Sequence, residues 1–419
     1  MSLYKHLEAD ASSASSGAQL RSPRYNDPVL TERLEFIPQN DAEIFAATPP
    51  SAAVFLLRGD ASAEPYISKT ANLRRRLQRL LSPPEERTKR LNLRNRVHTI
   101  EYTATGSDFE SSFLLYQLLR ETFSKNYSAR LRLRFAPVVK LHLENEYPRA
   151  SITTRLGRRQ GKSLYYGPFV SRIAAEKFAN DSLDFFKMRR CVDDLHPDPA
   201  FPGCIYSEMK MCLAPCFKGC TDDEYRDEVV RVQSYLDTRG RSLEREFEHQ
   251  RDDASANLDF EAAAALHARV EKLKPVLAQL PEIVHRLDHL NGIIVQPSAT
   301  KDCVSLFRVD VGCLAGPAAF SIQPPEHTKS QSMESRVQQT LEAIPPFEAH
   351  SSLEAMEHLA ILKRWFYRGT RIGEAFFADN TGELPMRRIV RGISRVYRGE
   401  KPELESGPSQ TASPISPLQ

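Results

Sequence analysis

The chain has no stretch that approaches the roughly 18 consecutive apolar residues of a membrane-spanning helix. Residues 1–19 are rich in serine and alanine, and they lack the basic start and apolar run of a secretory signal peptide. These two absences predict a cytoplasmic protein. No internal repeat is present, and the 419 residues suffice for about two to four domains.

The net charge is only +3, but it is distributed unevenly. From Lys69 to Arg96 there are ten Lys and Arg residues against two Glu. A local excess of this kind indicates a polyanionic partner such as nucleic acid. A solvated helix face gives the same pattern, so charge alone leaves both interpretations open.

Apolar patterns divide the chain into segments of different type. A short apolar run at 52–57 predicts a buried strand, and leucines at helical spacing over 72–81 predict a helix. Ser107 followed by Glu110 is a capping box, which predicts the start of another helix. The expected fold class is therefore α+β and multidomain. Its expected segments are a flexible leader (1–48), a small α/β domain (49–130), a cysteine-rich α/β middle region (131–221), a helical region with a hairpin (222–292), a C-terminal α/β region of unknown role (293–399) and a disordered tail (400–419).

Cysteine is scarce, with seven residues, yet five of them lie between Cys191 and Cys220. Without an export signal a disulfide scaffold is disfavoured, and a metal or cluster site is the stronger interpretation. Thiolates suit both Zn²⁺ and iron–sulfur clusters. The spacing C-x12-C-x7-C-x3-C lacks the paired knuckles of zinc ribbons, but by itself it leaves the two alternatives open. The four residues at this spacing are Cys191, Cys204, Cys212 and Cys216.

Four distinctive blocks occur in one order between residues 52 and 289. They are Glu-Tyr-Pro-Arg at 146–149, Tyr-Gly-Pro-Phe at 166–169, the cysteine run at 190–216 and Asn-Leu-Asp-Phe-Glu-Ala-Ala at 257–263. Together they resemble the UvrC family of nucleotide-excision-repair proteins, a family of excinucleases.

This resemblance implies a cofactor and a protein partner. The family carries a [4Fe–4S] cluster on the four cysteines, which favours the cluster over zinc at Cys191, Cys204, Cys212 and Cys216. The family's UVR motif is a helical hairpin that pairs with a like segment of UvrB. The expected partner surface is an apolar stripe on one helix, formed by Phe260, Ala263, Ala264, Leu266 and Val270.

The domain at 49–130 resembles the GIY-YIG nucleases, which cleave DNA with a tyrosine beside a glutamate-bound metal ion. The resemblance implies the catalytic residues Tyr66, Lys69 and Arg76. It also implies a DNA-binding set formed by Lys69, Asn72, Arg74, Arg75, Arg76 and Arg79.

Several positions depart from the nuclease pattern, and a further tyrosine of the family falls on Leu80. Phe55 stands at the first tyrosine, Ser68 at the glycine and Leu115 at the metal-binding glutamate. A leucine cannot bind Mg²⁺, which prefers oxygen ligands. Glu110 lies five residues earlier, about 140° round the helix, so we do not expect it to substitute. Cleavage and Mg²⁺ binding are therefore expected to be lost, while DNA binding persists.

The favoured function is a repair protein that binds DNA and a UvrB-like partner with a degenerate nuclease domain. The RNase H-like and helix-hairpin-helix domains of full-length UvrC are not found after His289. One alternative is an active single-incision DNA endonuclease, which requires another carboxylate in the pocket. A second alternative is a protein-docking module with no DNA role.

Overall fold

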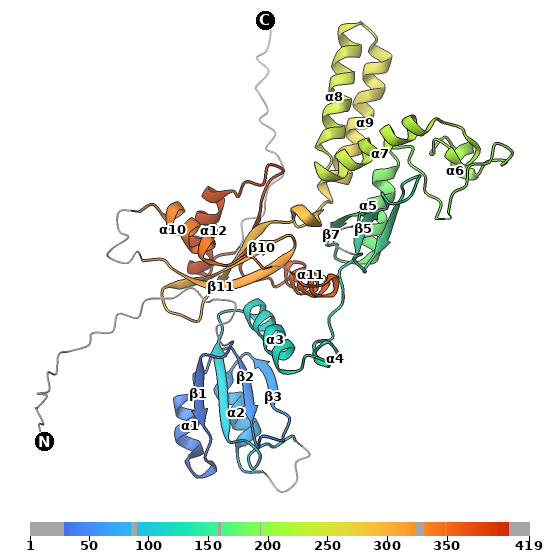
Figure 1. Ribbon diagram of the computed structural model, residues 1–419. Coiled ribbons are helices and arrows are strands. Elements are labelled where there is room, and N and C mark those ends of the chain that lie inside the picture. The colour runs from blue at the N-terminus through green and yellow to red at the C-terminus, as the bar shows by residue number, and fades with distance from the viewer. Residues whose placement is uncertain are drawn as a thin grey trace, which may run out of the picture.

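The computed structural model describes residues 29–84, 90–157, 161–192, 194–323, 331–347 and 349–401. Within these residues the chain forms three four-stranded antiparallel sheets, each accompanied by helices (Figure 1). This arrangement confirms the expected mixture of helix and strand. No helix in the described part of the chain is long and apolar enough to cross a membrane.

The first sheet has the strand order β1-β4-β2-β3. Its central strand β2 is buried on both faces, as its continuous apolar run predicts, because a helix lies on either side. The elements of this region are β1 (Glu32–Glu35), α1 (Asp41–Ala47), β2 (Ala53–Arg58), β3 (Tyr66–Thr70), α2 (Leu73–Leu81), β4 (Thr99–Ala104), α3 (Asp108–Thr122), α4 (Tyr127–Leu131) and a 3-10 turn at Pro38–Asn40.

The prediction of a flexible leader over residues 1–48 is wrong for residues 29–48. β1 pairs with β4 and forms an edge of the sheet, and Phe36 and Phe45 are buried against the α2 side of the sheet. These two aromatic rings provide the burial that orders a segment whose polar composition suggested a flexible chain. Residues 1–28 and most of the predicted tail, 402–419, lie outside the described residues.

The second sheet, β6-β5-β7-β8, belongs to the middle of the chain and carries the helical hairpin. Helices α8 and α9 lie side by side and project from the body (Figure 1). Leu243 and Phe247 of α8 pack with Val270 and Leu273 of α9 at the base of the hairpin. The elements are β5 (Val138–Leu141), β6 (Ala150–Thr153), β7 (Leu164–Gly167), α5 (Arg172–Leu183), α6 (Ile205–Glu208), α7 (Asp222–Asp237), α8 (Arg241–Ala256), α9 (Phe260–Ala278), β8 (His285–Arg286) and 3-10 turns at Pro215–Phe217 and Leu287–His289.

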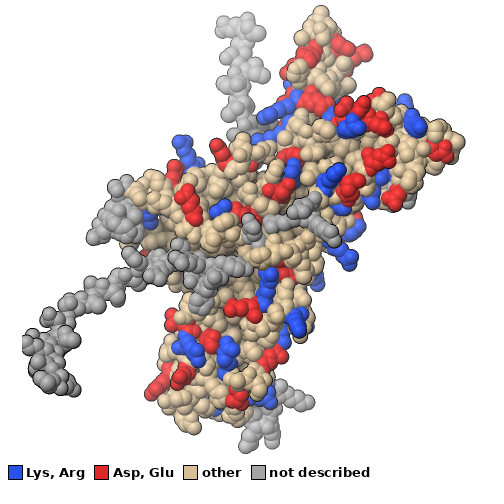
Figure 2. Space-filling model, viewed as in Figure 1, with Lys and Arg blue, Asp and Glu red and all other residues tan. Residues whose placement is uncertain are grey.

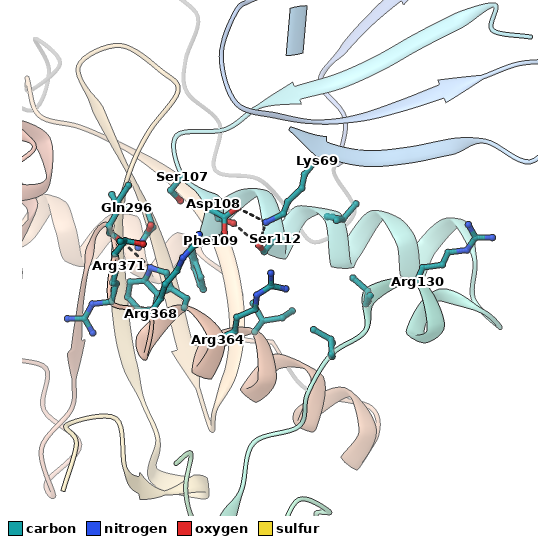
Figure 3. A pocket seen from close by; sticks show the side chains of 17 residues that line it. Lys69, Ser107, Asp108, Phe109, Ser112, Arg130, Gln296, Arg364, Arg368 and Arg371 are labelled. Atoms are coloured by element: carbon teal, nitrogen blue, oxygen red, sulfur yellow. Dashed lines mark hydrogen bonds and ion pairs between the residues drawn. The ribbon is translucent and has the colours of Figure 1, made fainter. Parts of the chain in front are cut away.

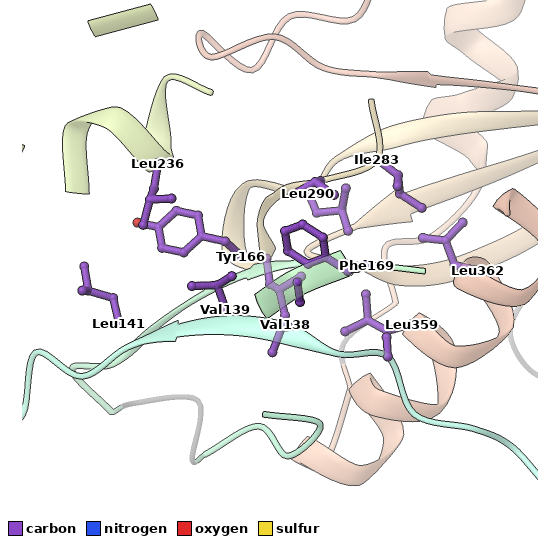
Figure 4. Packing of buried hydrophobic residues seen from close by; sticks show 14 of the residues in the cluster. Val138, Val139, Leu141, Tyr166, Phe169, Leu236, Ile283, Leu290, Leu359 and Leu362 are labelled. Carbon is purple, nitrogen blue, oxygen red and sulfur yellow. The ribbon is translucent and has the colours of Figure 1, made fainter. Parts of the chain in front are cut away.

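The third sheet, β11-β10-β9-β12, is covered on one face by α10 and α12 and on the other by α11 and α3. Figure 4 shows how the α11 face continues into the middle region: Leu359 and Leu362 of α11 lie near Val138, Phe169 and Leu290. The elements are β9 (Gly292–Pro297), β10 (Cys303–Asp310), β11 (Cys313–Ser321), α10 (Met333–Ala343), α11 (Ser352–Phe366), β12 (Glu374–Phe377) and α12 (Met386–Arg398).

Helix α3 is buried on two sides because it lies between the first and third sheets. Leu114 and Leu118 pack on β2, with Val54 and Leu56. On its other side are three aromatic residues at i, i+4 and i+7, and they face the third sheet and α11. These residues are Phe109, Phe113 and Tyr116.

The aromatic side of α3 makes ring contacts with the C-terminal region. The ring centroid of Phe109 lies 5.0 Å from those of both Phe307 and Trp365. The ring of Tyr116 lies 5.2 Å from that of His358. Because aromatic pairs at these separations contribute beyond their area burial, this contact fixes the first sheet to the third.

A buried polar network flanks the aromatic contact. The hydroxyls of Tyr116 and Tyr127 donate to Oε2 of Glu357 at 3.0 and 3.2 Å, and Arg120 forms an ion pair with Glu354. Both carboxyls are 1% exposed, so removal of their donors would leave buried acceptors with fewer partners or none. The network therefore makes the α3–α11 contact specific as well as strong.

Phe113→Ala should lower the free energy of unfolding by about 3–5 kcal/mol, because Phe113 is 1% exposed and its removal leaves a cavity beside Phe307 and His358. Phe260, which is 66% exposed, provides the matched control, and Phe260→Ala should cost less than about 0.5 kcal/mol. Urea denaturation followed by circular dichroism measures both values. Equal losses in the two variants would contradict the buried contact.

Candidate nucleic-acid interface and cysteine cluster

A cavity of about 280 Å³ lies between α3, α11 and the end of β9. Figure 3 shows Lys69 reaching from β3 toward α3, with Arg364 and Arg368 on the opposite side. Five of the lining residues are cations and one is an acid, so the cavity has an excess of positive charge. Its lining residues with polar side chains are Lys69, Ser107, Asp108, Ser112, Arg130, Gln296, Arg364, Arg368, Thr370 and Arg371.

The single acid of the cavity, Asp108, is held by two cations. Lys69 Nζ donates to Asp108 Oδ1 at 2.6 Å and to Ser112 Oγ at 2.7 Å. Arg368 Nη1 donates to Asp108 Oδ2 at 2.7 Å. Burial acts to raise the pKa of Asp108, but Lys69 and Arg368 together hold it below its usual value. Both oxygens of this carboxylate are therefore already occupied by cationic donors.

The three expected catalytic residues are not brought together. Tyr66 packs on the α2 side of the first sheet, where its hydroxyl accepts from Arg76 Nη2 at 2.7 Å. Lys69 is three residues further along β3, so it points to the opposite face, toward α3. Ser68 pairs with Phe55 across β2 and β3, and Phe55 is fully buried. The structure thus places Tyr66 and Arg76 on one face and Lys69 on the other.

Leu115 lines the same cavity as Lys69 and packs on the β2 side of α3. Glu110 points elsewhere: its Oε2 accepts from the Gly106 N–H at 2.9 Å and from Ser305 Oγ at 3.5 Å. Burial raises the pKa of Glu110 to about 7. Glu110 therefore does not supply the carboxylate that Leu115 lacks.

Most of the expected DNA-binding face of α2 is engaged internally. The side chain of Asn72 caps the helix by accepting from the Arg75 N–H at 2.9 Å. Arg74 donates to the carbonyls of Thr48 and Ala46, and Arg76 binds Tyr66. Among the described residues the side chains of Arg75 and Arg79 are exposed and have no such partner. The face drawn in Figure 2 likewise shows Lys and Arg interspersed with Asp and Glu.

The four cysteines of the predicted ligand set lie within electrostatic range of one another. Burial raises the pKa of Cys212 to about 11, and the other three thiols act in the same direction. The Ala214 N–H donates to the Cys212 sulfur at 3.3 Å and acts to lower the pKa. Arg189 Nη1 donates to the sulfur of Cys191 at 3.4 Å. All four side chains are partly exposed and none forms a disulfide.

This loop bends through several left-handed positions, at Gly203, Lys210, Ala214 and Lys218. Within the described residues no group of three or more His, Cys, Asp or Glu side chains stands as a preformed site for a metal ion. The four thiols and the N–H donors to sulfur are nevertheless the donor set that an iron–sulfur cluster uses.

The α8–α9 hairpin exposes apolar side chains at its tip. Leu258 is 73% exposed with φ of 61°, and Phe260 is 66% exposed. Ala263 and Leu266 are half-buried and Ala264 is exposed. Val270 is 2% exposed in the core, so the expected partner stripe is wrong at this residue. The apolar stripe runs along α9 from the tip of the hairpin to its base, and at the base α8 covers it.

Comparisons with known proteins identify the family. A sequence model of the UvrC/Cho excinuclease middle domain matches residues 136–235. UvrABC system protein C of Rickettsia rickettsii is 28% identical over 258 residues, which cover 60% of this chain and 38% of that protein. The protein of the same name from Idiomarina loihiensis is 28% identical over 217 residues, covering 50% and 34% respectively. The chain is a UvrC-family protein.

The chain spans about two fifths of the length of the curated relatives that it matches: for the Rickettsia bellii protein the share is 39%, at 27% identity over 254 residues. No solved structure matches it significantly. The matched family domain contains β5, β6, β7 and most of α7, together with the four cysteines.

Sequence reasoning on this UvrC-family chain missed four residues of the cavity. One was Asp108, which stands at i, i+4 and i+7 with Ser112 and Leu115 and so shares their face of α3. Arg364 and Arg368 flank three aromatic residues, and this basic and aromatic pattern is typical of nucleic-acid binding sites. Gln296 carried no signal, because it lies inside a strand that is otherwise apolar.

Glu110→Gln should remove a pH dependence of stability. Because the folded state raises the Glu110 pKa from 4.5 to about 7, the native state favours the protonated carboxyl. That contribution is complete below about pH 4.5 and is lost as the pH rises through about 7. Glutamine mimics the protonated form, so the variant should match the wild type at about pH 4 and exceed it at about pH 8, by up to about 3 kcal/mol.

Urea titrations at the two pH values measure this difference. Glu121→Gln, at an exposed position of the same helix, is the control and should leave the pH dependence unchanged. An identical loss of stability with rising pH in the wild type and in Glu110→Gln would contradict the assignment.

Proposed function

We propose that this UvrC-family chain acts in nucleotide excision repair as a DNA-binding accessory protein whose GIY-YIG-like domain does not cleave. The observation that carries the proposal is the composition of the α3 cavity. Leu115 lines it beside Lys69, and its one acid, Asp108, is bound by Lys69 and Arg368. The names of the relatives, UvrABC system protein C, support the repair context.

Metal-dependent cleavage is disfavoured by charge as well as by the loss of the glutamate. Mg²⁺ requires several oxygen ligands, and a carboxylate that already neutralises two cations is a poor one. The separation of Tyr66 from Lys69 acts in the same direction, since the nucleophile and the phosphate-binding cation must meet at one phosphate. The remaining cations still attract the phosphates of DNA.

The cysteine loop supports an iron–sulfur cofactor in this proposal. Cys191, Cys204, Cys212 and Cys216 would hold a [4Fe–4S] cluster, which would serve as a structural tie between the two ends of the loop. The Ala214 N–H and the Arg189 guanidinium would stabilise the ligated sulfurs through the hydrogen bonds they already make. A zinc ion on the same thiols is the alternative.

The hairpin tip supports a protein partner. Leu258 and Phe260 are large apolar side chains that project into solvent at the far end of α8 and α9. A free helical tip of this kind suits an amphipathic segment of a partner, and the family resemblance supports a UvrB-like protein as that partner. The exposed part of the stripe, Phe260 to Leu266, would form the contact.

The purified protein should bind duplex DNA with a steep salt dependence and should not nick it in Mg²⁺ or Mn²⁺. Phosphate contacts release counterions, so the logarithm of the affinity falls by about 0.9 per contact with the logarithm of the salt concentration. Arg75→Gln and Arg79→Gln, on the exposed part of α2, should each reduce that slope. Fluorescence anisotropy measures binding, and relaxation of damaged supercoiled plasmid measures nicking.

Robust nicking in the wild type that disappears in Tyr66→Phe would support an active endonuclease and contradict the inactive domain. Binding that is absent, or independent of salt, would instead support the pure protein-docking alternative.

Anaerobically purified protein should contain about four iron atoms per chain and show visible absorbance, as expected for a [4Fe–4S] cluster. Cys212→Ser should lower the iron content, whereas Cys313→Ser, at a buried cysteine of the third sheet, should keep it. Stoichiometric zinc without iron would establish the alternative metal.

A further inference from the structure

We propose that the cavity between α3 and α11 binds one nucleotide of a DNA strand, with the phosphate against Lys69, Arg364 and Arg368 and the base against Gln296. The inference rests on the proposed function, because DNA is the source of the nucleotide that it names. It assigns a role to the C-terminal region, which supplies most of the cations.

The cationic side of the cavity suits a phosphate. Arg364 is exposed and its guanidinium has no hydrogen-bond or ion-pair partner among the described residues. Arg368 and Lys69 share Asp108, so each retains N–H donors for a second anion. The amino end of the 15-residue helix α3 adds its positive dipole on the same side, through Ser107 to Ser112. These groups come from three separate segments, and they converge because α3 packs on α11 (Figure 3).

Gln296 supplies the independent evidence for a ligand. Its side chain lines the cavity and is 0% exposed, yet neither its amide nitrogen nor its amide oxygen has a hydrogen-bond partner. A buried polar group without a partner costs about 1–3 kcal/mol. A bound base that presents a donor beside an acceptor pairs with both amide atoms at once and removes this cost.

The remaining walls are apolar and aromatic. Phe109, Leu131, Ile361 and Trp365 line the cavity, so a flat heterocyclic ring finds van der Waals contact there. The volume of about 280 Å³ is slightly below the roughly 300–1,000 Å³ of small-molecule sites. That size suits one nucleotide and excludes a duplex, so the occupant is a single unpaired nucleotide.

Binding of three probes to the full-length protein tests this inference: a labelled single-stranded oligonucleotide, deoxyadenosine monophosphate and inorganic phosphate. The double variant Arg364→Gln/Arg368→Gln should weaken the oligonucleotide and the mononucleotide by about tenfold or more. Asp108→Asn should strengthen both, because it removes the charge that competes for Lys69 and Arg368. Arg226→Gln, at an exposed arginine of α7, is the control and should change neither.

Gln296→Leu separates a ligand role from a packing role. The substitution removes the unpartnered amide, so the ligand-free protein should keep or gain stability in urea while the mononucleotide binds less tightly. Inorganic phosphate, which lacks a base, should bind this variant and the wild type equally. A variant that loses stability while its nucleotide affinity is unchanged would overturn the role of Gln296.

The outcomes distinguish this inference from the proposed function. Tighter binding of the oligonucleotide than of the mononucleotide identifies a DNA strand as the source, and the reverse identifies a free nucleotide. Equal oligonucleotide binding by the wild type and the double variant would overturn the inference and leave DNA binding to another surface. Cavity-dependent binding of the mononucleotide without any DNA binding would overturn the proposed function instead.

Discussion

The packing of α3 between two sheets is the contact on which the rest of the structure depends. One side of the helix belongs to the core of the first sheet, through Leu114 and Leu118. The other side places Phe109, Phe113 and Tyr116 in the core shared by the middle and C-terminal regions. Close backbone approach accompanies this packing: a Cβ at Gly106 would lie 2.0 Å from the carbonyl oxygen of Pro297. Any side chain at 106 would therefore push the two sheets apart.

This contact has chemical consequences for the cavity beside α3. Arg364 and Arg368 of the C-terminal region line the same cavity as Leu115 of α3, so the cavity is cationic rather than acidic. Asp108, the one carboxylate that lines the cavity, forms ion pairs with Lys69 and Arg368. The lining of this cavity therefore favours anions over metal ions.

The sequence predicted the local elements well, because each depends on short-range signals. The apolar run of β2, the Ser107 cap before α3 and the helical spacing of leucines in α2 all correspond to elements in the structure. What the sequence did not reveal depends on contacts between distant segments. The aromatic side of α3 resembles ordinary core until its partners, 190 residues or more away, are known. The absence of hydrogen-bond partners at the buried amide of Gln296 likewise follows only from the folded structure.

Two site predictions failed for geometric reasons. Motif alignment joined Tyr66 and Lys69 in one active site, but strand alternation in β3 sends them to opposite faces. The apolar stripe of α9 was assigned to a partner along its length, but its lower part packs on α8, so Val270 is buried. In both cases the prediction failed on the direction of the side chain, which depends on the strand or helix that carries it.

The double-mutant cycle between Tyr116→Phe and Glu357→Gln tests the central contact most directly, because these residues are 241 positions apart and meet only if α3 packs on α11. With the hydrogen bond intact at 3.0 Å, the unfolding free energies should yield a coupling of about 1 kcal/mol or more. A coupling of zero, with the single variants additive, would show that α3 and α11 do not meet in solution and would contradict the account.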